Sequence, residues 1–169
     1  MKKAIIILAI MASLPFISDA QKINWITFEE AIKLNETAPR KLFIDVFTDW
    51  CGWCKKMDAT TFTDKSVVEY INNTYYPVKF NAETNDTIQF AGYTFINEGG
   101  TNGRKGTHQL AAALLQGKLS YPSYVFMNEK NQLLTIVPGY LEVKDILPIL
   151  RYFGTDAYLN QDWQEYNKQ

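Results

Sequence analysis

The chain has 169 residues and a formal net charge of −1; hydrophobic residues make up 47% of it and charged residues 21%. These values are ordinary for a globular protein and allow one domain with a substantial core. They exclude a disordered chain, and the balanced charge without a Lys/Arg stripe excludes a nucleic-acid-binding protein.

The first twenty residues have the pattern of a secretory signal peptide. Lys2-Lys3 precedes an unbroken apolar run over residues 4–10, and Ser18-Asp19-Ala20 places small residues at the two positions that signal peptidase reads. We therefore predict an exported protein with a mature domain over residues 21–169, periplasmic if the source is a Gram-negative bacterium. An uncleaved N-terminal anchor is the alternative, although the apolar run is short for a membrane span of about 20 residues.

A helix and a buried strand are predicted next. Thr27 and Glu30 form the pattern of a capping box, which predicts a helix that ends before Pro39. Residues 41–48 follow as a nearly continuous apolar run, typical of a strand covered on both faces. Asp45 lies inside this run, and it needs a partner or a function because an unpaired buried carboxylate is costly.

Two helices and a strand precede an irregular region. Helices are predicted over residues 51–58 and after a cap at Thr63 or Asp64, and residues 76–80 form a strand that contains another misplaced charge, Lys79.

Residues 82–106 have no strong helix or strand periodicity. Residues 88–90 and 93–95 could pair as a hairpin. The Gly-rich stretch 98–106 lacks the spacing of a phosphate-binding loop and is predicted to be a surface loop.

The last third of the chain predicts a helix, a strand hairpin and a closing helix. The expected elements are a helix capped by Thr107 and ending near Gln116, strands over 124–127 and 133–137, a helix over 143–153 and a short helix around Trp163. Early strands separated by helices imply parallel pairing, and the late hairpin implies an antiparallel edge. The sequence therefore predicts an α/β fold with a mixed central sheet and helices on both faces.

Cys51 and Cys54 are the only cysteines of the chain, and they form a Cys-x-x-Cys between a predicted strand and a predicted helix. A zinc site needs about four ligands, which these cysteines and His108 do not supply, and we expect His108 at the surface. A disulfide between Cys51 and Cys54 would close a loop too short to stabilise the fold much. The pair is therefore predicted to be a redox site, with no cofactor besides its own disulfide and no metal.

Several residues around this pair resemble the active site of the thioredoxin-fold family. The stretch Trp50-Cys51-Gly52-Trp53-Cys54-Lys55 resembles the family's Trp-Cys-Gly-x-Cys-Lys motif, and Asp45 and Lys79 stand where thioredoxins carry a buried aspartate and the lysine that faces it. Tyr121-Pro122-Ser123 resembles the cis-proline loop, with serine where family members usually have threonine, and Gly139 matches the glycine after the last strand.

One branch of the family is more similar than the others. The run from Trp50 to Met57, followed by Thr61-Phe62, resembles secreted thioredoxin-like proteins similar to the C-terminal domain of the bacterial inner-membrane disulfide reductase. The resemblance covers residues 23–153 and fails over about 82–118, where this chain is longer. It implies a thioredoxin-like fold with an insertion before the cis-proline loop.

The resemblance also implies thiol–disulfide exchange, in which a thiolate attacks a disulfide and a second thiol resolves the mixed disulfide. We expect Cys51 to be the exposed nucleophile, because a helix N-terminus should lower its pKa from about 8.5 into the range of about 3.5–7.5. Cys54, one turn inside, would be the resolving thiol. Asp45 would take or give its proton, with a pKa raised by burial and moderated by Lys79; a purely structural ion pair is the alternative.

The other candidate residues would bind substrate. If Pro122 is cis, backbone groups of Tyr121 lie beside the dithiol, where an extended substrate could pair as an added strand; an ordinary trans turn is the alternative. Trp53 lies between the cysteines and is expected to be an exposed platform for substrate, together with Gly52 and Trp50; a place in the core is the alternative for the two tryptophans.

We therefore expect a thiol–disulfide oxidoreductase that reduces or isomerises protein disulfides. Trp53 stands where oxidants and isomerases commonly carry histidine, which favours a reductase. The implied partners are protein disulfides and an upstream electron-donor thiol protein, which can be membrane-bound, and we expect a monomer. The alternative is a chaperone-like thioredoxin-fold module that binds partners without turnover, although such a module does not need Asp45 and Lys79.

Overall fold

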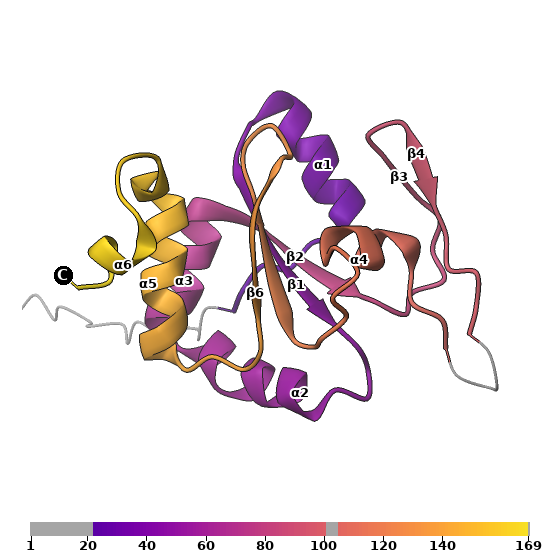
Figure 1. The fold of residues 1–169 in the computed structure, drawn as a ribbon, viewed down its shortest axis with the longest axis horizontal. Coiled ribbons are helices and arrows are strands. Elements are labelled where there is room, and N and C mark those ends of the chain that lie inside the picture. The colour runs from indigo at the N-terminus through magenta and orange to yellow at the C-terminus, as the bar shows by residue number, and fades with distance from the viewer. Residues whose placement is uncertain (1–21, 101–104, 169) are drawn as a thin grey trace, which may run out of the picture.

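The computed structural model describes residues 22–100 and 105–168, so the predicted signal peptide and part of the Gly-rich stretch lie outside the described residues. Four strands form the central sheet in the order β2-β1-β5-β6 (Figure 1). They are β1 (Lys41–Phe47), β2 (Tyr75–Asn81), β5 (Ser123–Met127) and β6 (Leu133–Pro138). β1 pairs parallel with β2 and antiparallel with β5, and β6 pairs antiparallel with β5, so the predicted mixed sheet is confirmed.

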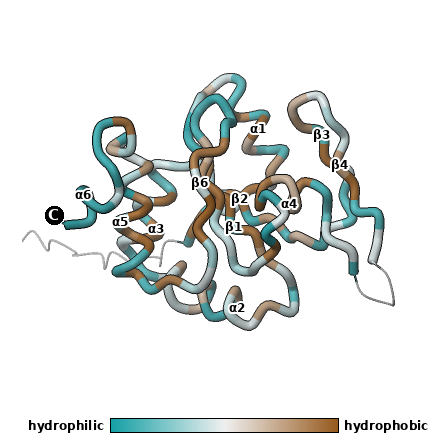
Figure 2. The backbone as a smooth tube through the Cα atoms, viewed as in Figure 1, coloured by the Kyte–Doolittle hydropathy of each residue, from teal (hydrophilic) through white to brown (hydrophobic). Residues whose placement is uncertain are grey.

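Helices cover both faces of this sheet, as predicted (Figure 1). One face packs against α1 (Phe28–Thr37) and α4 (Gln109–Leu114). The other packs against α2 (Gly52–Ala59), α3 (Lys65–Thr74) and α5 (Val143–Gly154). Hydrophobic residues concentrate along the central strands between these two layers (Figure 2), because a strand buried on both faces presents apolar side chains alternately to each layer.

Short elements complete the fold. They are the hairpin of β3 (Ile88–Phe90) and β4 (Tyr93–Phe95), the 3-10 turns η1 (Thr61–Thr63) and η2 (Ala157–Leu159), and α6 (Trp163–Tyr166). The predicted hairpin and C-terminal helix are therefore confirmed, and the hairpin lies beside α1, outside the main sheet (Figure 1).

Local caps explain most of the helix starts. The Thr27–Glu30 capping box is present, and the carboxylate of Asp64, rather than Thr63, caps α3. The cap of α4 was predicted wrongly: it is His108, not Thr107, because the His108 ring accepts the Leu110 N–H at 3.1 Å. A Ser, Thr, Asp or Asn is the usual cap, so the sequence pattern favoured Thr107.

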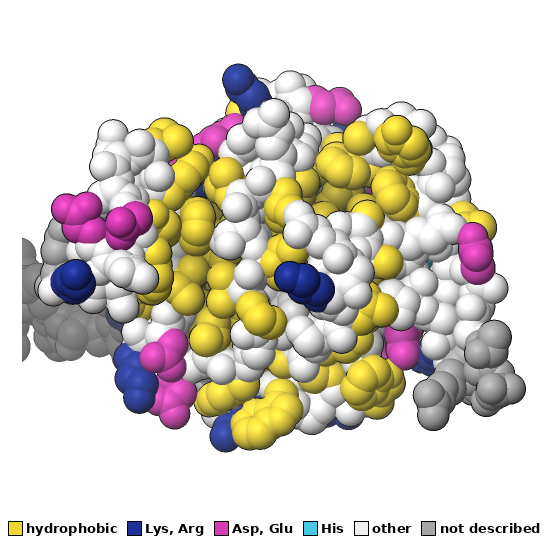
Figure 3. Space-filling view, in the orientation of Figure 1, with side chains coloured by type: hydrophobic (Ala, Val, Ile, Leu, Met, Phe, Trp, Pro, Cys, Tyr) yellow, Lys and Arg dark blue, Asp and Glu magenta, His cyan; other side chains and the backbone are white. Residues whose placement is uncertain are grey.

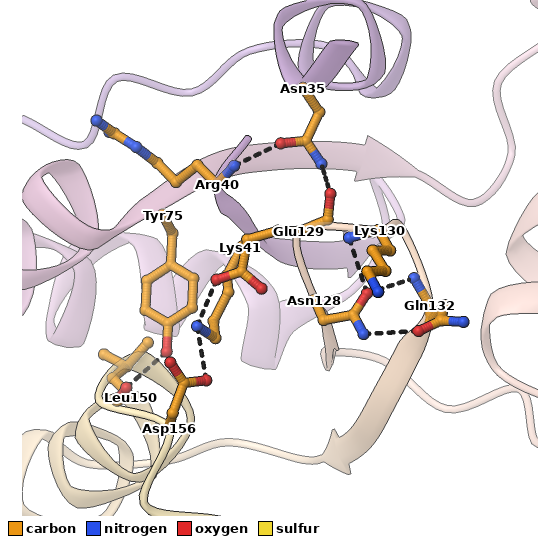
Figure 4. A network of polar contacts seen from close by, with 10 residues as sticks. All are labelled: Asn35, Arg40, Lys41, Tyr75, Asn128, Glu129, Lys130, Gln132, Leu150 and Asp156. Atoms are coloured by element: carbon orange, nitrogen blue, oxygen red, sulfur yellow. Dashed lines mark hydrogen bonds and ion pairs between the residues drawn. The ribbon is translucent and has the colours of Figure 1, made fainter. Parts of the chain in front are cut away.

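Lys41 ties together three distant parts of the chain (Figure 4). Its side chain is buried at the start of β1, and its Nζ binds Glu129 Oε1 in the β5–β6 turn at 2.6 Å and Asp156 Oδ1 after α5 at 2.8 Å. Asn35 of α1 adds a hydrogen bond from its Nδ2 to the Glu129 carbonyl. This network fixes the end of the molecule opposite the cysteines.

We expect Lys41→Met to lower the free energy of unfolding by about 1–3 kcal/mol, because two half-exposed carboxylates would lose a buried partner. Urea unfolding at pH 7 measures the loss. Lys144→Met is the control: its ion pair with Glu142 is exposed on both sides, so no measurable change is expected. Equal stabilities of Lys41→Met and the parent would show that the network is not stabilising.

Candidate active site

The two cysteines lie where β1 leads into α2. Cys51 is the N-cap residue of α2, with an extended backbone conformation, and its Sγ accepts a hydrogen bond from the Cys54 N–H at 3.0 Å. The two residues are joined in a disulfide, with their Cα atoms 5.3 Å apart. The Sγ of Cys51 therefore already occupies the position where free N–H groups and the positive end of the helix dipole would favour a thiolate after reduction.

Cys51 is not exposed, contrary to the prediction. It is 4% exposed in the disulfide form, and Cys54 is 2% exposed. The reason is that the Cys51 sulfur is turned onto the end of α2, where it caps the helix and bonds to Cys54. Exposure therefore does not distinguish the two cysteines, whereas their positions at the helix end do.

Asp45 and Lys79 are brought together by the register of β1 and β2, in which they are direct neighbours. Asp45 is 1% exposed, and its Oδ2 accepts a hydrogen bond from Lys79 Nζ at 2.5 Å. The same ammonium group binds Asp58 Oδ1 at 2.5 Å. A role of Asp58 in the site was not predicted from the sequence. Its position one helical turn after Cys54 was the available signal, because that spacing places both side chains on the same face of the helix.

Aromatic rings surround the ammonium group of Lys79. Its Nζ lies 4.9 Å from the ring centre of Phe47, 5.2 Å from that of Trp25 and 5.6 Å from that of Phe62. Ring faces attract a cation and exclude water. The lysine is therefore fixed beside Asp45.

Burial raises the pKa of Asp45 to about 6, and the nearby charge of Asp58 adds to this, while the charge and hydrogen bond of Lys79 oppose it. A carboxyl group with this pKa exchanges protons readily near neutral pH. The arrangement can therefore hold or release one proton on the same side of the sheet as α2.

Trp50 and Trp53 are the exposed aromatic residues next to the disulfide, with 66% and 57% of their surfaces exposed. Hydrophobic side chains are visible at the edge of the molecule where α2 lies (Figure 3). Trp50 Nε1 donates to Glu83 Oε1 at 2.8 Å, and its ring meets that of Tyr121 edge-on at 5.9 Å.

Trp53 is held by a different set of contacts. Its ring centre lies 5.4 Å from that of Tyr140, after β6, and the Nζ of Lys56 sits 4.9 Å from the Trp53 ring centre and 4.7 Å from that of Tyr140. Trp53 is therefore an exposed but positioned platform. Neither Glu83 nor Tyr140 could be linked to the tryptophans from sequence, because each contact joins distant segments.

The remaining candidate residues lie near this surface. The Tyr121–Pro122 peptide bond is cis, and the Pro122 carbonyl accepts the Gly139 N–H at 2.8 Å. Gly52 is exposed, as the first residue of α2.

Residues 82–118 reach the edge of the site at two points. Glu83 holds Trp50, and Lys105 Nζ lies 3.2 Å from Oδ2 of Asp49, two residues before Cys51.

His108, also in this segment, was expected at the surface, and that prediction is wrong. The residue is fully buried, its Nε2 lies 3.0 Å from the Asp86 carbonyl, and its role is structural.

Over the described ranges, no group of three or more His, Cys, Asp or Glu side chains could hold a metal ion. In the same part of the chain, no helix has the length and apolar character needed to cross a membrane.

Comparisons with known proteins agree with this geometry. Residues 28–154 match the family model of the thioredoxin-like domain. A curated relative, an uncharacterised protein of Archaeoglobus fulgidus, is 29% identical over 79 residues, which is 47% of this chain; the chain spans only 62% of that relative's length.

Three solved structures are similar in fold. A thioredoxin-fold protein from Helicobacter pylori has a TM-score of 0.58 at 17% identity, with 89% of this chain and 84% of that chain covered. A thioredoxin from Thermus thermophilus has a TM-score of 0.58 at 16% identity, with coverage of 78% and 87%. A putative disulphide-isomerase from Bacteroides thetaiotaomicron has a TM-score of 0.53 at 22% identity, with coverage of 86% and 99%.

We expect Asp45→Asn to stabilise the disulfide form above neutral pH. The folded-state pKa of Asp45 is raised from 3.8 to about 6, so the stability that its protonated form contributes is complete below about pH 4 and is lost as pH rises through about 6. Asparagine cannot ionise, so the variant does not lose this stability as pH rises. Between pH 4 and pH 8 the stability of Asp45→Asn should therefore rise relative to the parent by about 3 kcal/mol.

Urea unfolding of both proteins at several pH values tests this. A stability difference that is the same at pH 4 and pH 8 would contradict the raised pKa.

Proposed function

Because this chain belongs to the thioredoxin-like domain family, we propose that it is an exported thiol–disulfide oxidoreductase that reduces protein disulfides through Cys51 and Cys54. The observation that carries the proposal is the disulfide at the N-terminus of α2, on the side of the sheet where the carboxyl group of Asp45 is buried. A stabilising disulfide needs neither the helix end nor the buried acid.

The reaction begins with the reduced protein. The Cys51 thiolate attacks one sulfur of a substrate disulfide, so a mixed disulfide forms and the other substrate sulfur leaves as a thiolate that takes up a proton. Cys54 then loses its proton to Asp45 and attacks the Cys51 sulfur, which releases the second substrate sulfur as a thiolate. The substrate gains two electrons, and the protein keeps the Cys51–Cys54 disulfide.

Asp45 is suited to the proton transfer because its pKa of about 6 lies near the working pH. Lys79 favours the ionised carboxylate, so Asp45 can accept a proton instead of staying permanently protonated. Asp58 binds the same ammonium group, and its negative charge partly opposes the preference of Asp45 for the ionised form.

The exposed aromatic residues would form the surface that contacts the substrate. Trp50 and Trp53 offer apolar surface on either side of Gly52, and the backbone of Tyr121 before Pro122 is offered as an edge for an extended substrate segment. The substrates would be protein disulfides in an extracytoplasmic compartment.

Each turnover leaves the protein oxidised, so a dithiol donor must restore it. We propose an upstream thiol protein as this donor, and a monomer as the working form. Isomerisation would use the same mixed disulfide, but a second thiolate of the substrate would attack it and release Cys51 as a thiolate, so no net electrons would be transferred.

We expect the parent protein to reduce insulin repeatedly when dithiothreitol regenerates it. Cys54→Ser should accumulate a mixed disulfide with the substrate, because the resolving thiol is missing, and Cys51→Ser should not. Non-reducing electrophoresis and mass spectrometry identify the adduct. If Cys51→Ser reduced insulin while Cys54→Ser trapped nothing, the assignment of the two thiols would be wrong, and a parent that binds but never reduces insulin would favour the binding module.

Export predicts a mature chain that starts at Gln21. Expression of the full chain in a Gram-negative host should place it in the periplasmic fraction, with an N-terminus at residue 21 by mass spectrometry. A chain that keeps residues 1–20 and sediments with membranes would instead support an uncleaved anchor.

A further inference from the structure

One oxygen of the buried carboxyl group of Asp45 is unused. Oδ2 binds Lys79, whereas Oδ1 is buried and has no hydrogen-bond partner among the described residues. A buried carboxylate oxygen without a donor is costly, and buried polar atoms are nearly always paired. The site therefore calls for a donor on the side of Asp45 away from Lys79.

Tyr124 of β5 stands at that side. It is the direct antiparallel neighbour of Asp45, so both side chains point to the same face of the sheet. Tyr124 is fully buried, and its hydroxyl group also has no hydrogen-bond partner within the described part of the chain. Two unpaired polar groups of complementary type, an acceptor and a donor, thus occupy paired positions of adjacent strands.

The ring of Tyr124 is fixed by its neighbours. It stacks on Phe43 with ring centres 5.7 Å apart and meets Phe62 edge-on at 5.9 Å. Aromatic packing of this kind restricts the ring, so the hydroxyl group stays on the α2 side of the sheet. If Tyr124 only packed in the core, phenylalanine would serve equally well at this position.

The charged groups around the pair keep this hydroxyl protonated. Burial, followed by the charges of Asp45 and Asp58 and by Tyr140, raises the pKa of Tyr124. Lys79 of β2 and Asp58 of α2 also act on Asp45, and Cys54 lies on the same α2 helix. Throughout the working pH range Tyr124 is therefore a hydrogen-bond donor.

We propose that Tyr124 is a positioning residue for Asp45: its hydroxyl group supplies the hydrogen bond that Oδ1 lacks, across one bridging water molecule. This bond favours the ionised carboxylate and holds it in place for the proton of Cys54. Lys79 of β2 and, through the water molecule, Tyr124 of β5 then each bind one oxygen of the Asp45 carboxylate, from the strands on either side of β1. The consequence for turnover rests on the proposed function, whereas the consequence for the titration of Asp45 does not.

The test is the titration of the Asp45 carboxyl carbon, followed by NMR in the oxidised full-length protein labelled with ¹³C-aspartate. Tyr124→Phe removes only the hydroxyl group, and we expect it to raise the midpoint by about 0.5–1 pH unit, because a donor to the charged form is lost. The matched control is Tyr75→Phe. Tyr75 is also buried and packs on Phe43, but its hydroxyl group binds the Leu150 carbonyl, so no shift is expected.

A second measurement needs no variant at the tyrosine. In the parent protein the ¹³Cζ resonance of Tyr124 should shift with the same midpoint as Asp45, near pH 6, and this shift should disappear in Asp45→Asn. The proposal is overturned if the Asp45 midpoint is unchanged in Tyr124→Phe. It is also overturned if the Tyr124 resonance does not shift as Asp45 ionises.

Insulin reduction separates this proposal from the proposed function. If the protein turns over, the pH midpoint of the rate should move with that of Asp45 in Tyr124→Phe and stay in place in Tyr75→Phe. A protein that never reduces insulin but shows the titration shifts would refute the proposed function and keep the contact between Tyr124 and Asp45. A rate profile that moves without any shift of the carboxyl resonance would refute the contact.

Discussion

The burial of a carboxyl group beside a lysine, on the side of the sheet that carries the disulfide, is the interaction on which the rest of the site depends. Asp45 can be buried because β1 and β2 pair in a register that places Lys79 next to it. Lys79 in turn can be held in an apolar setting because three aromatic rings surround its ammonium group and Asp58 binds its open side. The sheet register, the three aromatic rings and Asp58 of α2 therefore all hold the same pair, Asp45 and Lys79.

Charged networks at the two ends of the sheet have different physical characters. At the Lys41 end, both carboxylates are half-exposed, so each keeps part of its hydration while it binds the lysine. At the Asp45 end, the carboxylate is buried and its pKa is raised to about 6, which shows that burial outweighs the stabilisation from Lys79. An apolar residue would be more stable there. The presence at this place of an acid whose ionisation destabilises the folded protein is an argument that Asp45 has a chemical function.

Local interactions could be predicted from the sequence, and long-range ones could not. The capping box of Thr27 and the apolar run of β1 depend on neighbours within a few residues, so their patterns are visible in the chain. The contacts of Glu83 with Trp50 and of Tyr140 with Trp53 join segments about 33 and 87 residues apart, and no local pattern encodes them. The exposure of Cys51 was predicted wrongly because exposure depends on where the sulfur turns, which the motif does not specify.

The buried acid and the two exposed tryptophans depend on contacts that share only α2. The acid, its lysine and the packed aromatic residues come from the strands and α2, and changes there would disturb the core. The supports of the two tryptophans come instead from the segment after β2, through Glu83, and from α2 and the loop after β6, through Lys56 and Tyr140. The support of Trp50 shares no residue with that of Trp53, and neither includes Asp45 or Lys79, so in the proposed reaction each flank of the disulfide could change its shape while the buried acid keeps its partner. Loops that surround a fixed centre in this way allow one reaction to serve different protein substrates.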